Sequence, residues 1–131
     1  MSDSKNPKFP KVGVFLVVIS VSGKWLFDVR RGTPRLPFKE LAGGESWEGA
    51  LGLVKKTVAV EIKSHSLTGI GTGEGQNQEN WVYCAFKSEG IKEVLLEGYQ
   101  WLAPETCNTL EGLDLKIKQA FYVSPNHFWA D

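Results

Sequence analysis

The hydrophobic positions of this chain change their spacing several times, and each spacing predicts a type of element. A nearly continuous apolar run over residues 12–21 predicts a buried strand, because a strand that is covered on both faces has no polar side. A turn at residues 22–24 follows, and residues 25–30 then alternate as a second strand. Residues 31–40 contain two prolines and predict a loop.

Three further strands are predicted in the second half of the chain, over residues 66–73, 80–87 and 98–102. The middle strand alternates cleanly and places Trp81 and Tyr83 on the same face. A last helix is expected to open at residues 104–106. Its apolar face would carry four residues at helical spacing: Leu110, Leu113, Ile117 and Phe121.

One amphipathic helix is predicted over residues 46–63. Ser46 is a suitable N-cap, because its hydroxyl can accept a free backbone N–H of the first turn. An apolar stripe follows at helical spacing, formed by Trp47, Ala50, Val54 and Val58 and widened by Leu51, Leu53 and Ile62. Residues 57–63 also alternate as a β-branched strand would, so their helix or strand character stays open.

Length and composition indicate a single domain over residues 11–131, preceded by a flexible polar arm at residues 1–10. The formal net charge is zero, so no global field attracts polyanions, and nucleic-acid binding is compatible but not favoured. The apolar run is too short to span a membrane. Cys84 and Cys107 lie outside any metal-binding spacing, which predicts reduced thiols in a cytoplasmic protein.

Three local patterns follow one another in an order that resembles the Nudix hydrolase fold. Residues 26–31 resemble the family's second strand, which ends in a basic pair. Residues 44–51 resemble the turn into the helix of the Nudix box, and residues 97–105 resemble a late strand that runs into a helix. The resemblance covers most of residues 12–121. It implies an α+β protein, with a Nudix-like α/β/α sandwich around a mixed central sheet.

The Nudix box itself is degenerate in this chain. The box is Gly, five residues, Glu, seven residues, Arg-Glu, an apolar residue, any residue, Glu-Glu, any residue, Gly and an apolar residue. Its glutamates bind Mg²⁺, a hard cation that needs oxygen ligands, and residues 49–60 contain no Asp or Glu. If the first glutamate is Glu45, the Arg-Glu pair becomes Leu53-Val54 and the Glu-Glu pair becomes Thr57-Val58.

Other registers of the box do no better. When the first glycine is Gly44, residues 58–59 replace Arg-Glu and residues 62–63 replace Glu-Glu. When it is Gly43, one carboxylate is recovered, that of Glu61. No register keeps two metal-binding glutamates.

Two pairs of residues are predicted to bind a ligand. Arg30 and Arg31 at a strand end could hold phosphates through bidentate hydrogen bonds, with a solvated strand end as the alternative. Trp81 and Tyr83 could stack on a nucleobase if exposed, with packing under the last helix as the alternative.

Two glutamates are the weak metal or catalytic candidates. Glu45 resembles the first glutamate of the box, although it could equally interact with the positive end of the helix dipole. Glu61 is the best surviving candidate within the helix, although it could instead pair with a lysine or face water.

Three functions fit the sequence. The favoured hypothesis is a non-hydrolytic binder of a nucleotide-like ligand, an RNA element or a protein partner, without a cofactor. The second is a hydrolase of a nucleoside diphosphate derivative, whose Mg²⁺ or Mn²⁺ is held by carboxylates from outside the standard box. The glutamates available for that are Glu40, Glu45, Glu61, Glu97 and Glu105. The third is an interaction module whose apolar helix face forms a homodimer.

Overall fold

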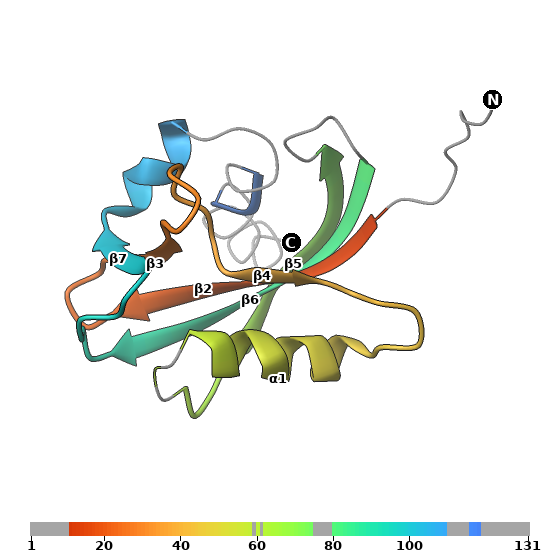
Figure 1. The fold of residues 1–131 in the computed structure, drawn as a ribbon, viewed down its shortest axis with the longest axis horizontal. Helices are drawn as coiled ribbons and strands as arrows, with labels where there is room; N and C mark the ends of the chain where they lie inside the picture. Colours follow the sequence, from red (N-terminus) through yellow and green to blue (C-terminus); the bar gives the residue numbers. More distant parts are fainter. Residues whose placement is uncertain (1–10, 59, 61, 75–79, 110–115, 119–131) are drawn as a thin grey trace, which may run out of the picture.

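A computed structural model describes residues 11–58, 60, 62–74, 80–109 and 116–118. Its centre is a mixed sheet of six strands in the order β5-β6-β2-β3-β7, with β4 paired to β2 outside this path (Figure 1). The pairing of β2 with β6 is parallel, and the other pairings are antiparallel. The strands are β2 (Lys11–Ser20), β3 (Trp25–Asp28), β4 (Phe38–Glu40), β5 (Ser66–Glu74), β6 (Asn80–Ile91) and β7 (Tyr99–Leu102).

The central strand β2 is covered on both faces. Phe15 and Val17 point into one buried cluster, whereas Val14 and Leu16 point into the other, and all four side chains are fully buried. Two buried faces explain why this strand reads as a continuous apolar run and not as an alternation. The predicted strand at residues 12–21 is therefore confirmed, shifted by one position.

The helix α1 (Trp47–Thr57) lies on one face of the sheet, below it in Figure 1. The backbone N–H of Gly49 donates to the Ser46 hydroxyl over 3.0 Å, which confirms Ser46 as the N-cap. Ala50 and Val54 are buried against the sheet, as the helical spacing predicts. Leu53 is 43% exposed and does not widen the buried stripe.

The prediction that this helix continues to Lys63 is wrong, because α1 ends at Thr57. Val58 is the C-cap and is fully buried. Val60 and Ile62 pack against the same cluster from backbone that is no longer helical. Because β-branched side chains lose rotamer freedom in a helix, burying them from irregular backbone is favoured over continuing the helix.

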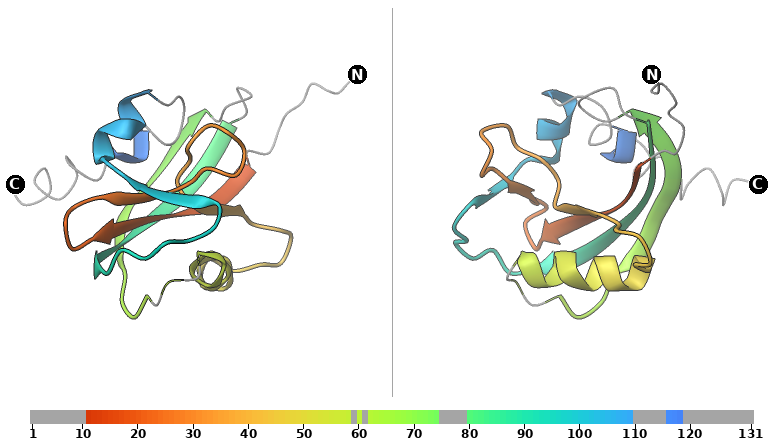
Figure 2. Two further views of the ribbon diagram at one scale, coloured as in Figure 1. Left: turned by 60° about the vertical axis from the view of Figure 1, so that its left-hand side comes forward. Right: turned by 45° about the vertical axis from the view of Figure 1, so that its right-hand side comes forward.

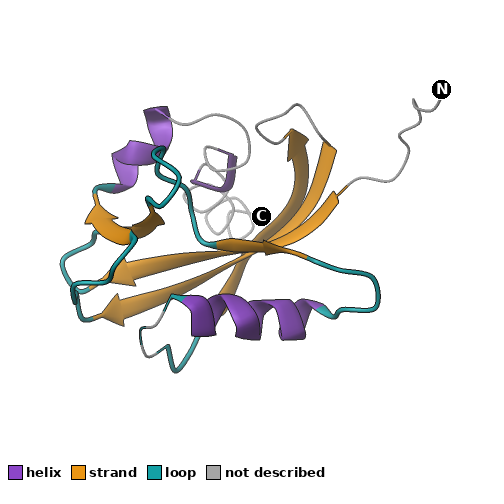
Figure 3. Ribbon diagram, viewed as in Figure 1, coloured by secondary structure: helices purple, strands orange, loops and turns teal. Residues whose placement is uncertain are grey.

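The other face of the sheet carries the 3₁₀ helix η1 (Pro104–Thr109) and the helical residues 116–118 (Figures 1 and 3). Ile117 is fully buried in the cluster on this face, as the spacing of the expected last helix predicts. Helical segments on both faces of a mixed sheet confirm the predicted α/β/α sandwich (Figure 2). Three other residues of the expected helix lie outside the described residues: Leu110, Leu113 and Phe121.

The prediction that residues 31–40 form only a loop is wrong at its end, where β4 begins. β4 pairs with β2 through Gly13 and Phe15, and β3 pairs with the same edge of β2 farther along at Ile19. Between them, Asp28 and Arg35 exchange two backbone hydrogen bonds of 2.8 and 3.0 Å. The turn between β3 and β4 is therefore tied back to the sheet and fixes the arginines that follow β3.

No helix in the described part of the chain is long and apolar enough to cross a membrane. The flexible arm predicted at residues 1–10 lies outside the described residues.

Candidate functional site

Two small cavities adjoin near the end of β3: one lies where the C-terminal half of α1 faces β3, β4 and β7, and the other lies at the turn between β3 and β4. The first, the helix cavity, has a volume of about 120 Å³, and its described lining is Asp28, Arg30, Pro37, Phe38, Lys39, Leu53, Val54, Thr57, Val58 and Tyr99. The second, the arginine cavity, also measures about 120 Å³, and its described lining is Asp28, Arg30, Arg31, Thr33, Arg35 and Phe38. Asp28, Arg30 and Phe38 line both, so the two cavities adjoin.

Arg30 is held firmly where the two cavities meet. Its Nε donates to Oδ1 of Asp28 over 3.0 Å, and its terminal nitrogen donates to Oδ2 over 2.6 Å. The guanidinium also lies over the ring of Tyr99, 5.3 Å from the ring centre. The hydrogen bond from Arg30 holds the pKa of Asp28 below its usual value, and the same bond raises the pKa of Arg30. Arg30 is thus positioned, but its charge is largely compensated by Asp28.

Two further arginines line the arginine cavity. Arg31 is exposed at its rim. Arg35 lies over the ring of Phe38, with its guanidinium carbon 4.5 Å from the ring centre. Guanidinium groups form bidentate hydrogen bonds with phosphates and carboxylates, and here three of them face one carboxylate. Sequence reasoning missed Arg35, although a third arginine close to Arg30 and Arg31 was a signal that could have found it.

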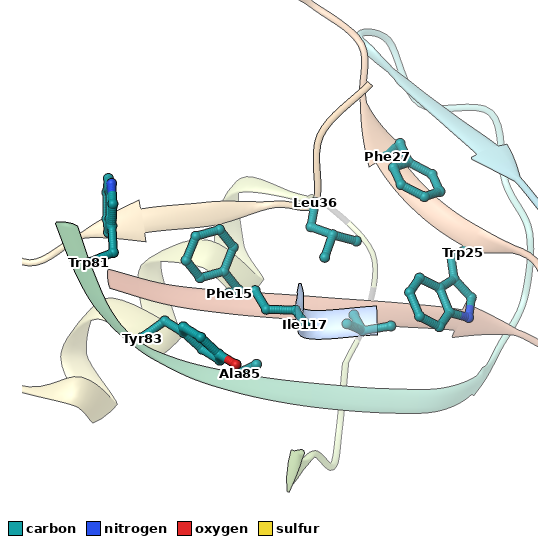
Figure 4. Close-up of a cluster of buried hydrophobic side chains, with 9 residues drawn as sticks. Phe15, Trp25, Phe27, Leu36, Trp81, Tyr83, Ala85 and Ile117 are labelled. Atoms are coloured by element: carbon teal, nitrogen blue, oxygen red, sulfur yellow. The ribbon is translucent and has the colours of Figure 1, made fainter. Parts of the chain in front are cut away.

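Trp81 and Tyr83 do not form an exposed stacking pair, so that expectation is wrong. They are 7% and 2% exposed and belong to the cluster that contains Ile117, as the packing alternative predicts (Figure 4). Trp81 contacts Phe15 edge-on, with ring centres 6.2 Å apart. Glycines make this packing possible: a Cβ at Gly71 would lie 2.9 Å from the Tyr83 hydroxyl.

Glu45 closes the turn that precedes α1. Its Oε1 accepts the backbone N–H of Ala42 over 2.9 Å and lies 3.1 Å from Nζ of Lys39. The hydrogen bond from Ala42, followed by the one from Lys39, holds the pKa of Glu45 below its usual value. The described linings of the helix and arginine cavities do not include Glu45. In this structure Glu45 therefore organises a turn.

The other glutamates proposed as metal ligands are scattered. Glu40 lies 3.9 Å from Nζ of Lys11, and Glu97 and Glu105 are exposed. Glu61 lies outside the described residues. Among the residues that the structure describes, no three His, Cys, Asp or Glu side chains come together as a metal site. The Asp28 carboxylate is already hydrogen-bonded to Arg30, so it would have to leave that pair to bind a cation.

This architecture is similar to that of several solved structures, whereas no family model and no curated protein sequence matches the chain. A Nudix hydrolase from Nitrosomonas europaea is similar with a TM-score of 0.63 and 18% identity, covering 88% of this chain and 90% of that chain. The Nudix domain of Shewanella oneidensis NrtR, in complex with ADP ribose, gives a TM-score of 0.66 and 14% identity, covering 96% and 93%.

A third similar structure is that of the complex between the C-terminal domain of mouse MUTYH and human PCNA, with a TM-score of 0.61 and 17% identity, covering 91% of this chain and 90% of the matched chain. Identities this low show a common fold and not a common activity. These structural similarities, together with the sheet order and the position of α1, show that this chain has a Nudix-like fold.

Proposed function

We propose that this protein is a non-hydrolytic member of the Nudix fold that binds a phosphate-bearing, nucleotide-like ligand or a macromolecular partner, without a cofactor. One observation carries the proposal: α1 and its C-cap contribute no carboxylate to the described lining of the helix cavity, where they place Leu53, Val54, Thr57 and Val58. In the box register that begins with Glu45, these four residues occupy the Arg-Glu and Glu-Glu positions. Their common face in one cavity supports that register.

The carboxylate of Asp28, opposite α1, also argues against metal chemistry. Asp28 is the one carboxylate in the described lining of the helix and arginine cavities, and Arg30 occupies both of its oxygens. Mg²⁺ bound to a diphosphate ordinarily uses one or two protein carboxylates in near-octahedral geometry. Binding an ion through Asp28 would require breaking this bidentate pair.

The arginine cavity supports binding of an anion. Arg30, Arg31 and Arg35 all line it, and guanidinium groups form charge-assisted hydrogen bonds with a phosphate. Its volume of about 120 Å³ is well below the roughly 300–1,000 Å³ of pockets that enclose a drug-sized ligand. We therefore expect a phosphate group to enter, while the rest of the ligand lies on the surface.

The comparisons fit both kinds of ligand. The NrtR Nudix domain was solved with ADP ribose, which carries a diphosphate, and the MUTYH domain was solved with a protein, PCNA. Leu53, an exposed apolar residue on α1, would suit contact with a protein partner or a second copy of this chain. A cytoplasmic location and a homodimer stay predictions.

The first experiment combines turnover and thermal shift. The protein is incubated with ADP ribose, ADP and other nucleoside diphosphate compounds, each with Mg²⁺ or Mn²⁺. We expect no metal-dependent cleavage. A compound present at a hundred times its dissociation constant should stabilise the fold by about 2.7 kcal/mol. Arg31→Gln should reduce that shift, whereas Lys56→Gln, an equal charge change on exposed α1 surface away from the arginine cavity, should not.

Each result has a distinct meaning. Metal-dependent cleavage that Glu45→Gln abolishes would overturn the proposal and make Glu45 a metal ligand. Stabilisation without cleavage would support a nucleotide-like ligand. Absence of both would favour the macromolecular partner, which the same Arg31→Gln variant can then test in binding assays.

A further inference from the structure

The strand β5 (Ser66–Glu74) forms one margin of the sheet, next to β6 and at the opposite end of the strand order from β7 (Figure 2). On its outer side, no strand and no backbone hydrogen bond from the described residues meets it. Because the N–H and C=O groups of an antiparallel strand point alternately to its two sides, every second residue of β5 presents a donor and an acceptor at this outer edge. The edge is therefore a template for another extended chain.

β5 lacks most of the features by which edge strands avoid such pairing. Lysine, proline and short length are the usual protections, but residues 66–73 contain no proline and no charged residue. The register shifts once, between Leu67 and Gly69, and residues 69–74 then pair regularly with β6. β5 has nine residues, whereas β7 at the opposite margin has four. Of these two margins, β5 is the one long enough to pair extensively with a further strand.

The face of β5 on the α1 side is apolar and exposed. Leu67 is paired with Phe86 and projects on the same face, and Phe86 packs against the cluster that contains α1. Ile70 is paired with Cys84, which lies on the same face of β6 as Phe86 because side chains alternate along a strand. Leu67 and Ile70 are nevertheless 53% and 66% exposed, since α1 lies over β2 and β4. Exposed apolar side chains beside an open strand edge indicate an interaction surface.

The opposite face of β5 carries glycines. Gly71 is paired with Tyr83, and a Cβ at Gly71 would lie 2.9 Å from the Tyr83 hydroxyl, so the tyrosine ring covers this part of the strand. Gly69 and Gly73 follow the same alternation. On this face β5 has no side chain that could block an approaching strand. Glycine also weakens a strand that has a single neighbour, so a second neighbour would stabilise β5.

A second copy of this chain matches this edge in geometry and in charge. Antiparallel pairing of β5 with its equivalent creates a two-fold axis, which closes the assembly at a dimer and leaves neither β5 edge open. With the axis perpendicular to the sheet, the α1 faces of both copies lie on the same side. Leu67 and Ile70 then meet their equivalents across the junction. Residues 66–73 are uncharged and the chain has a formal net charge of zero, so electrostatic repulsion between copies is small.

We propose that two copies of this chain associate through β5, in an antiparallel register centred near Ile70, and form one continuous sheet across the dimer. Backbone groups supply the hydrogen bonds, and Leu67 and Ile70 supply the apolar contact. A single strand pair is a small interface, in the weak class that buries less than roughly 1,200 Å² in total, so the dimer dissociates on dilution. The interface does not rest on the function proposed for the arginine cavity, because the described linings of the helix and arginine cavities contain no residue of β5.

The test is sedimentation velocity over a wide range of protein concentration, with amide hydrogen exchange measured at both ends of that range. We expect a monomer–dimer equilibrium, and alternate amides of β5 should exchange more slowly at high concentration. Ile70→Lys should weaken dimerisation about tenfold or more, because it removes apolar contact and places like charges across the axis. Val21→Lys is the matched control, since Val21 is an apolar residue on the turn after β2 that is 75% exposed, and it should leave dimerisation unchanged.

Two further variants test the symmetry and the location of the interface. A mixture of Ile70→Lys and Ile70→Glu chains should dimerise more tightly than either variant alone, because opposite charges then meet near the axis. Leu53→Lys tests the alternative interface on α1 and should leave the dimer intact. A thermal unfolding midpoint for each variant shows that it is folded.

The inference is overturned if the chain stays monomeric at every concentration, or if Leu53→Lys dissociates the dimer and Ile70→Lys does not. It is also overturned if the β5 amides are protected equally at all concentrations, since a segment of the same chain would then cover the edge. Failure of the mixed Ile70 variants to associate would exclude the two-fold register.

Discussion

The two ends of α1 are maintained by different interactions, although the helix is only 11 residues long. At the N-terminal end, Ser46 caps the helix and Glu45 closes the preceding turn, and both act through short polar contacts with nearby backbone. At the C-terminal end, Val54 and Val58 are 3% and 0% exposed and act through contacts with distant strands. The helix therefore begins through local chemistry and ends through tertiary packing.

Under the proposed function, this difference explains how the site would lose its chemistry while the fold persists. The N-terminal features that orient α1 are separate from the C-terminal positions that would carry metal ligands. Apolar side chains at the latter positions lose possible ligands, yet they bury area that stabilises the sheet, by about 25 cal/mol for each Å². Variants at each end can test whether one end depends on buried packing and the other on polar contacts.

The largest effect is expected from Val58→Asp. Val58 is fully buried among apolar side chains, so a carboxylate placed there should destabilise the fold by about 3–5 kcal/mol, measured by urea unfolding. Thr57→Asp is the control, since it puts the same charge on the same helix end but in solvent, and should cost about 1 kcal/mol or less. Equal losses for both variants would mean that burial is not what distinguishes this end.

A smaller effect is expected from Ser46→Ala. Loss of the hydroxyl leaves the Gly49 N–H without its cap, which should lower the free energy of unfolding by about 1 kcal/mol. Ser46→Asp keeps an acceptor at the same place and should retain most of the stability. If alanine were as stable as serine, the N-terminal end would depend on packing as the other end does.

The smallest effect concerns the pH dependence of Glu45. Its pKa in the folded chain lies below the ordinary value of 4.5 because the Ala42 N–H and Lys39 favour the charged form. Its contribution to stability is therefore present above the unfolded pKa and is lost as the pH falls through the folded pKa. Carboxyl NMR should show a depressed midpoint, and Lys39→Met should move it part of the way back. A midpoint at or above the ordinary value would contradict the turn-closing role.

Local patterns in the sequence predicted most of the sheet. The central strand, the alternation of β3 and β6 and the Ser46 cap depend on residues within a few positions of one another, and each is present in the structure. Local patterns did not decide three features: the short strand β4, the end of α1 at Thr57 and the burial of Trp81. Each depends on a partner far away in the chain.

The residues of the arginine cavity also divide into those that the sequence identified and one that tertiary pairing added. Arg30 and Arg31 were identifiable as a basic strand end, and the structure places both at the arginine cavity. Arg35 joins them because its backbone pairs with that of Asp28, a contact that residue spacing alone does not reveal.

The sequence by itself determined the strand periodicities, the helix start and the absence of box carboxylates from residues 49–60, because these are properties of neighbouring residues or of composition. Only the tertiary structure decided which faces are buried. The alternation of β6 allows Tyr83 to be a stacking surface or a core residue, and in the folded chain Gly71 on the adjacent strand β5 leaves space for its ring. Burial depends on which distant segments meet, and a strand's own period is the same whether its aromatic face meets solvent or core.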